Sequence, residues 1–214
     1  SDYSQTNIQV EGVDEADIVK NDGKYIYKVD ERGSYYGGSN KGKVIIIQAY
    51  PATEMKVVSE IEFEGQATEL FVYNQLVVFG SVYRVPTADE QPPVPPESQQ
   101  AGAPSAKMIA PDVMPRYGAN FGFMKIYDIS DRENPTLEKE IAVKGNYVSS
   151  RRIDGKVYAI FQEYAGYDYP MPLIEVDGVA RKVAPSEIKY FDYPDQSYNF
   201  DTFIGVDLND LAKT

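Results

Sequence analysis

The chain has 214 residues, with 21 Lys and Arg against 33 Asp and Glu, which gives a formal net charge of −12. It contains no Cys and no His, which excludes thiol nucleophiles, disulfides, a Ser-His-Asp triad and nearly all zinc or iron ligand sets. An acidic chain without a basic stripe is also a poor nucleic-acid binder, because the phosphate backbone is densely negative.

A repeated unit of predicted strands organises the chain in three copies. The first copy spans residues 16–65 and the second spans 67–145, while the third starts at 147 and is incomplete at 214. The matching strands Lys43–Tyr50, Phe123–Ser130 and Phe203–Asp210 start 80 residues apart each time. Strand modules that repeat at such a period are typical of propellers.

Each copy opens with a hairpin signal, which is Asn21-Asp22-Gly23 in the first, Tyr73-Asn74-Gln75 in the second and Asp154-Gly155 in the third. The fourth strand alternates charged and apolar residues, as in Ser59–Glu64 and Glu138–Val143, which predicts a half-exposed edge. Each copy is therefore predicted to be a four-stranded antiparallel meander, the form of a propeller blade. The expected fold is all-β, a single β-propeller-like domain of about two and a half blades over residues 1–214.

The third strand of each copy is the most apolar. Val44–Ile47 is a continuous β-branched run, typical of a strand that is covered on both faces. Such runs have the length of strands, so no membrane insertion is predicted within this chain.

Two long insertions interrupt the repeats. Residues 82–120 are rich in Pro and predict a solvated loop, with recognition by an aromatic groove as the other interpretation. Residues 164–202 are rich in Tyr and predict an ordered segment, with a small hairpin that turns at Asp177-Gly178. We expect this second insertion to make the contacts with a partner, because Tyr suits contact faces. Its candidate binding residues are Tyr164, Tyr167, Tyr169, Tyr190, Tyr193 and Tyr198.

Carboxylates gather before the first strand and again among the tyrosines of the second insertion. Their hard oxygens suit Ca²⁺, although the spacing does not fit an EF-hand. The candidate metal ligands are Asp14, Asp17, Asp195 and Asp201. In the alternative interpretation no cofactor is bound, and the Asp side chains cap turns and pair with lysines.

The segment Gln9–Tyr27 (QVEGVDEADIVKNDGKYIY) closely resembles the opening of a family of prokaryotic predicted secreted proteins with a C-terminal β-propeller domain. Ile126–Asp131, followed by Asn134-Pro135, is similar to the repeats of other bacterial surface propellers. The resemblance implies a propeller in a secreted or cell-surface, extracytoplasmic location, and no established activity. Since a closed ring needs at least ~4 blades, we expect partners or a longer parent protein to supply the rest.

Three functions stay open at this point. The first is a binding or scaffold module for a protein or a cell-surface ligand, without catalysis of its own. The second is a glycan-active hydrolase that uses paired carboxylates, although no motif selects a pair and no catalytic residue is assigned. The third is a structural fragment of a larger propeller, which predicts self-association through open blade edges at Lys43–Tyr50 or at the last strand.

Overall fold

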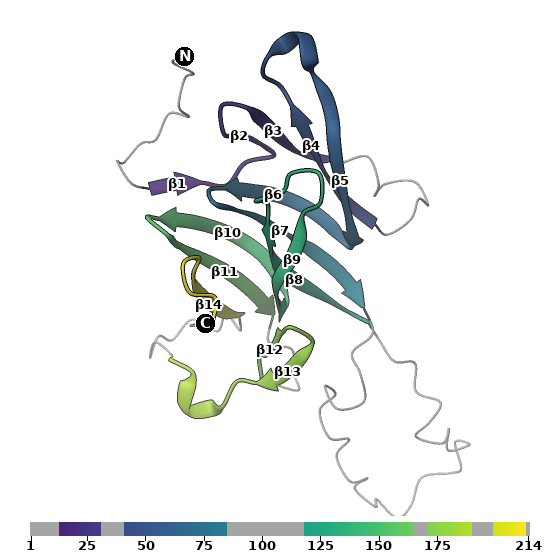
Figure 1. Ribbon diagram of the computed structural model, residues 1–214. Coiled ribbons are helices and arrows are strands. Elements are labelled where there is room, and N and C mark those ends of the chain that lie inside the picture. The colour runs from purple at the N-terminus through teal and green to yellow at the C-terminus, as the bar shows by residue number, and fades with distance from the viewer. Residues whose placement is uncertain (1–12, 31–40, 85–117, 165–170, 190–198, 213–214) are drawn as a thin grey trace, which may run out of the picture.

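The computed structural model describes residues 13–30, 41–84, 118–164, 171–189 and 199–212. In this part of the chain, antiparallel strands form three sheets, and the helical turns are limited to η2 (Ala52–Glu54) and η5 (Pro185–Glu187). The second sheet lies between the first and the third (Figure 1). Within these residues the chain has no helix with the length and apolarity that a membrane crossing requires.

The first sheet is a meander in which each strand pairs with the next one along the chain. Its strands are β2 (Val19–Asn21), β3 (Tyr25–Asp30), β4 (Lys41–Gln48) and β5 (Lys56–Glu64). β5 ends this sheet among the described residues, so the charged edge strand predicted at Ser59–Glu64 is confirmed. The open edge predicted at Lys43–Tyr50 is wrong, because β4 pairs with β3 on one side and with β5 on the other.

The second sheet has six strands. Its meander consists of β6 (Gln66–Val72), β7 (Gln75–Arg84), β8 (Ala119–Asp128) and β9 (Thr136–Lys144), and β12 (Leu173–Val176) and β13 (Val179–Lys182) extend it. The predicted hairpin in the Tyr-rich insertion is confirmed, with positive φ at Asp177 and Gly178. The prediction of an edge strand at Glu138–Val143 is wrong, because β12 of this hairpin pairs with β9.

The third sheet combines strands from both ends of the chain. Its order is β1 (Val13–Glu15), β10 (Asn146–Ile153), β11 (Lys156–Tyr164) and β14 (Asn199–Asp207). β14 occupies the place that β4 and β8 have in the other sheets, the third strand of a meander, and it ends this sheet among the described residues. The all-β antiparallel fold class is therefore confirmed.

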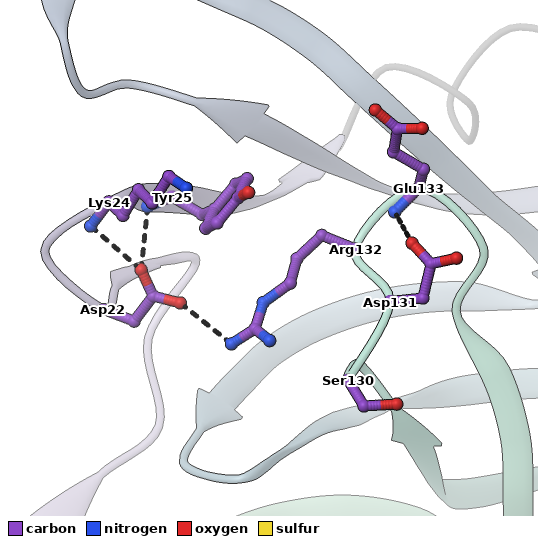
Figure 2. Close-up of a pocket in the computed structure, with 7 residues that line it drawn as sticks. All are labelled: Asp22, Lys24, Tyr25, Ser130, Asp131, Arg132 and Glu133. Atoms are coloured by element: carbon purple, nitrogen blue, oxygen red, sulfur yellow. Dashed lines mark hydrogen bonds and ion pairs between the residues drawn. The ribbon is translucent and has the colours of Figure 1, made fainter.

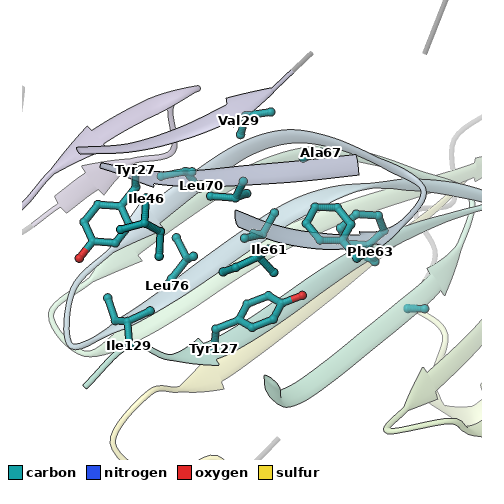
Figure 3. Packing of buried hydrophobic residues seen from close by; sticks show 14 of the residues in the cluster. Tyr27, Val29, Ile46, Ile61, Phe63, Ala67, Leu70, Leu76, Tyr127 and Ile129 are labelled. Atoms are coloured by element: carbon teal, nitrogen blue, oxygen red, sulfur yellow. The ribbon is translucent and has the colours of Figure 1, made fainter. Parts of the chain in front are cut away.

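Two apolar cores hold the three sheets together. In β7, Leu76 points into the core shared with the first sheet (Figure 3), and Val78 belongs to the same core. Val77 and Phe79 belong to the core shared with the third sheet. This alternation follows from the two-residue period of a strand. β7 and β8 are buried on both faces for this reason.

β4 differs from β7 and β8 in its burial. Val44 and Ile46 are fully buried, but Ile45 and Ile47 are only half-buried. The prediction that Val44–Ile47 is covered on both faces is thus right for one face only, because among the described residues the first sheet has a neighbouring sheet on one side.

One N-terminal stretch, residues 13–21, touches all three sheets, and we call it the crossing segment (Figure 1). Its β1 pairs with β10 of the third sheet, and its β2 pairs with β3 of the first. Between them, Asp17 exchanges two backbone hydrogen bonds with Leu70 of β6, at 3.1 and 2.8 Å. The crossing segment thereby connects the first sheet to β6 and to β10, which are the first meander strands of the second and third sheets.

Candidate functional site

The carboxylates of the crossing segment are engaged with basic side chains. Asp14 accepts a hydrogen bond from Lys20 Nζ at 2.9 Å, and its second oxygen lies 3.6 Å from Arg152 Nη2 of β10. These three side chains are largely covered, with 13%, 8% and 16% of their surface exposed. Glu15 pairs with Arg151 at 3.1 Å, but both of these side chains are well exposed.

The predicted calcium ligands are not brought together among the described residues. Asp17 Oδ1 accepts the backbone N–H of Ile18 at 2.7 Å, and Asp201, on β14, accepts a hydrogen bond from Gln162. Asp195 lies outside the described residues. In the described part of the chain, no three Asp or Glu side chains group closely enough to hold a metal ion. Asp14 forms ion pairs, as in the alternative interpretation of the acidic stretch. The calcium site stays a prediction.

A pocket of about 650 Å³ opens where the β2–β3 turn of the first sheet meets the β8–β9 turn of the second (Figure 2). Arg132 reaches across it: its Nη2 lies 3.3 Å from Asp22 Oδ2, and its Nε donates to the Tyr27 hydroxyl at 3.2 Å. Ser59 Oγ fixes the same turn by donating to the carbonyl oxygen of Arg132 at 2.8 Å. The lining residues are Asp22, Lys24, Tyr25, Ser130, Asp131, Arg132 and Glu133.

Both hydrogen-bonded carboxylates of this pocket are held in the ionised form. Burial acts to raise the pKa of Asp22, but hydrogen bonds from the backbone of Tyr25 and Lys24 and from Arg132 outweigh it and lower this pKa below its ordinary value. The Asn134 side chain and the Glu133 backbone N–H likewise lower the pKa of Asp131. A glycosidase acid requires the opposite shift, toward the protonated form. These two carboxylates therefore do not suit the acid role of the hydrolase hypothesis.

A third carboxylate does have a raised pKa. Burial raises the pKa of Glu163 of β11, and Lys144 of β9, whose Nζ lies 2.5 Å away, offsets this only in part. Glu163 is buried between the second and third sheets, away from the pocket at the turns. Its position fits an ion pair that joins two sheets rather than a group that meets a substrate.

We predict that Asp22→Asn lowers the free energy of unfolding by about 1 kcal/mol at pH 7. Asp22 Oδ2 accepts from Tyr27 and Arg132 while Oδ1 accepts two backbone N–H groups, and an amide has only one oxygen to accept with. The folded-state pKa of Asp22 is depressed, so its contribution is present above the unfolded-state pKa and is lost as pH falls through the folded-state value. Urea unfolding of both chains from pH 7 down to about pH 3 tests this. A difference in the free energy of unfolding between the wild-type and Asp22→Asn chains that stays constant over this pH range would contradict the prediction.

The outer face of the third sheet, which points away from the second sheet, exposes large side chains. Tyr158 and Tyr164 of β11 and Phe203 of β14 are 46%, 70% and 73% exposed. Tyr158 pairs with Gly205 and Ile160 pairs with Phe203, so Tyr158 and Phe203 lie close together on neighbouring strands. Tyr164 lies on the same face, four residues after Ile160 in β11. This face is the most aromatic exposed surface of a sheet among the described residues.

Of the six tyrosines predicted to bind a partner, the structure describes Tyr164. It ends β11 with its ring in solvent, while Tyr167, Tyr169, Tyr190, Tyr193 and Tyr198 lie outside the described residues. Sequence reasoning missed Tyr158, although the two-residue period places it on the same face of β11 as Tyr164. Phe203 was missed too, because its face depends on the pairing of β14 with β11. It also missed Arg132, because the pairing of a turn with a distant hairpin leaves no local signal.

Comparison with known proteins finds one family and one distant relative. A family model described as "Beta propeller domain" matches residues 3–214. An uncharacterized protein of Archaeoglobus fulgidus is 25% identical over 198 residues. That match covers 87% of this chain and 24% of the relative, so the chain spans about a quarter of the relative's length. No solved structure matches the chain significantly.

Proposed function

We propose, from the premise that the chain belongs to the β-propeller domain family, that it is a binding or scaffold module outside the cytoplasm. Its contacts are made with a protein or a cell-surface ligand, and it has no catalysis of its own. The three sheets are successive blades of the propeller. The first two are complete, and the third has three strands of its own meander, about two and a half blades in all.

The blade assignment rests on equivalent strand order. β2–β5 and β6–β9 are consecutive four-stranded meanders, and β10, β11 and β14 repeat their first three strands. The loops that follow β8 and β14 are alike as well: Asp128 accepts the N–H of Ser130, and Asp207 accepts the N–H of Asn209. The residues after these two carboxylates, Ile129 and Leu208, are both buried. Repeated local geometry of this kind supports a repeated blade.

The observation that carries the binding role is the exposed aromatic face of the third sheet. Large exposed apolar surface on a folded domain marks a contact site, and Tyr is enriched in such sites because its ring packs while its hydroxyl stays solvated. Tyr164 lies at the border between this face and the Tyr-rich insertion. The pocket at the turns supports glycoside hydrolysis less well, because the lowered pKa values of Asp22 and Asp131 do not suit the acid that this reaction needs.

The resemblance of Gln9–Tyr27 to secreted propeller proteins supports the proposed extracytoplasmic location. The net charge of −12 fits a protein or glycan ligand better than a nucleic acid. The absence of Cys is compatible with this location, since the fold is held by apolar cores rather than by disulfides.

Binding of cell-envelope proteins and glycans to the immobilised chain tests the proposal. We expect Tyr164→Ala to weaken the strongest interaction by roughly tenfold, as at an interface hot spot. Tyr83→Ala is the matched control, because Tyr83 is 59% exposed but lies on β7 of the second sheet. Retention of no ligand, equal binding by Tyr164→Ala, or turnover of a glycan or ester substrate would contradict the proposal.

A further inference from the structure

We propose that the pocket at the turns of the first and second sheets binds a neutral saccharide. Its walls combine a tyrosine ring with groups that donate and groups that accept hydrogen bonds (Figure 2). The volume of about 650 Å³ lies within the ~300–1,000 Å³ of ligand sites. The pocket is separate from the aromatic face of the third sheet, so this inference goes beyond the function proposed above.

The two junctions between neighbouring sheets share one backbone scaffold. At the first junction, between the first and second sheets, Ser59 Oγ donates to the carbonyl oxygen of Arg132 at 2.8 Å. At the second junction, between the second and third sheets, Lys139 Nζ donates to the carbonyl oxygen of Leu211 at 2.7 Å. Ser59 and Lys139 pair with the same position of the third meander strand. Arg132 and Leu211 each follow by four residues the aspartate that ends such a strand, β8 or β14, so the two contacts are equivalent.

The side chains on this scaffold differ between the two junctions. Leu211 packs against the core between the second and third sheets, whereas Arg132 lines the pocket. Tyr25 and Gln75 are equivalent, because each begins the second strand of its meander. Gln75 donates to the carbonyl oxygen of Leu208 in the next sheet at 3.0 Å. A junction of this fold therefore forms without an arginine or a tyrosine, and the first junction carries both in addition.

Tyr25 gives the pocket an aromatic wall. Its side chain is half-buried, since it packs against the core between the first and second sheets and also lines the pocket. Lys24 Nζ lies 5.3 Å and Arg132 Cζ lies 5.5 Å from the centre of its ring. The C–H groups of a sugar form an apolar face that packs on an aromatic ring, and the hydroxyls around that face accept hydrogen bonds from nearby cations. The ring and the two cations are thus placed to contact one sugar unit together.

The charges around the pocket favour a neutral ligand over an ion. Asp22, Asp131 and Glu133 contribute three negative charges, against two positive charges from Lys24 and Arg132. An anion would be repelled by the carboxylates, and a cation would be repelled by Lys24 and Arg132. Sugar hydroxyls both donate and accept hydrogen bonds, so they pair with groups of either sign.

Several polar groups of the pocket retain hydrogen-bonding capacity for such a ligand. Lys24 and Glu133 are exposed, and neither forms an ion pair with another residue in the described part of the chain. Arg132 donates from Nε and Nη2 to Tyr27 and Asp22, and its guanidinium has further N–H groups. The pocket therefore offers donors on Lys24 and Arg132 and an acceptor on Glu133.

Saturation-transfer NMR of the full chain with the neutral disaccharides maltose, cellobiose, lactose and diacetylchitobiose tests the proposal. We expect at least one of them to bind, and Tyr25→Ala to weaken its binding at least tenfold. Lys24→Ala should weaken it about threefold, the effect of one hydrogen bond. Lys24 is exposed, so this second variant keeps the test valid if the loss of the Tyr25 ring unfolds the chain. Tyr73→Ala is the matched control, because Tyr73 is 45% exposed and lies in the equivalent turn, between β6 and β7.

No binding of any neutral disaccharide, binding of the charged sugars sialic acid or glucosamine alone, or a disaccharide affinity that Lys24→Ala leaves unchanged overturns the proposal. Its failure is distinguishable from failure of the proposed function, because the two sites use different residues. Tyr164→Ala should leave the disaccharide bound, and Lys24→Ala should leave an envelope ligand bound to the third sheet.

Discussion

Replacing Asp14 by alanine is expected to lower the free energy of unfolding by about 3 kcal/mol, because it leaves Lys20 and Arg152 covered and without their carboxylate. Removal of one partner from a buried set of charges is costly even where the set as a whole adds little to stability. The crossing segment would then lose its covered ionic link to β10, although the exposed Glu15–Arg151 pair and the backbone pairing with β10 and β6 would remain. Urea unfolding of the wild-type and Asp14→Ala chains measures the loss.

Glu15→Ala is the matched control for this prediction. Glu15 is the next residue in β1 and also pairs with an arginine, Arg151, but the two side chains are 61% and 47% exposed. Exposed pairs contribute about 0–1 kcal/mol, so Glu15→Ala should change the stability by less than about 1 kcal/mol. Equal losses for the two variants would show that burial of the Asp14 pairs does not determine their importance.

Gly80→Ala is expected to cost about 3 kcal/mol, the upper part of the usual range for overpacking. A β-carbon at Gly80 of β7 would collide with the carbonyl oxygen of Gln66 and would lie 2.5 Å from the Phe123 ring. The backbone of β6 cannot retreat without breaking its pairing with β7, and Phe123 is fully buried. Thermal unfolding followed by circular dichroism should show a large fall in Tm.

Gly205→Ala provides the comparison for this second variant. Gly205 also lies in a strand, but its added β-carbon would approach the Tyr158 ring at an ordinary 3.4 Å. Alanine in a strand is favoured over glycine by about 0.5–1 kcal/mol, so this variant should be slightly more stable than the wild type. A Gly80→Ala chain as stable as Gly205→Ala would mean that the close approach of β6 and β7 is not required.

Local signals in the sequence predict the strands and turns well. The Asp-Gly signal at Asp177-Gly178 has the positive φ that its turn needs, and Asp154 has a φ of 53° at the turn between β10 and β11. The alternation of charged and apolar residues in β5 likewise predicts that this strand lies at the edge of its sheet. These features depend on residues that are close together in the chain, so composition and spacing are sufficient to find them.

Contacts between distant segments could not be predicted in this way. Nothing local in Leu173–Val176 indicates that this strand pairs with β9, and nothing local in Val13–Glu15 selects β10 as its partner. The acidic stretch was ambiguous because ion pairs and metal sites use the same carboxylates, and the distinction depends on the positions of Lys20 and Arg152. Exposure of the third sheet's outer face likewise depends on which sheets are neighbours.

The measurement that tests the proposed binding role most directly is the retention of cell-envelope proteins and glycans by three chains, the wild type, Phe203→Lys and Val179→Lys. Phe203 and Val179 are both 73% exposed, but Phe203 lies on the aromatic face of the third sheet and Val179 lies on β13 of the second sheet. We expect Phe203→Lys to weaken the strongest interaction by at least tenfold, as at an interface hot spot, and Val179→Lys to leave it unchanged. Equal binding by the three chains, or no retained ligand, would contradict the binding role.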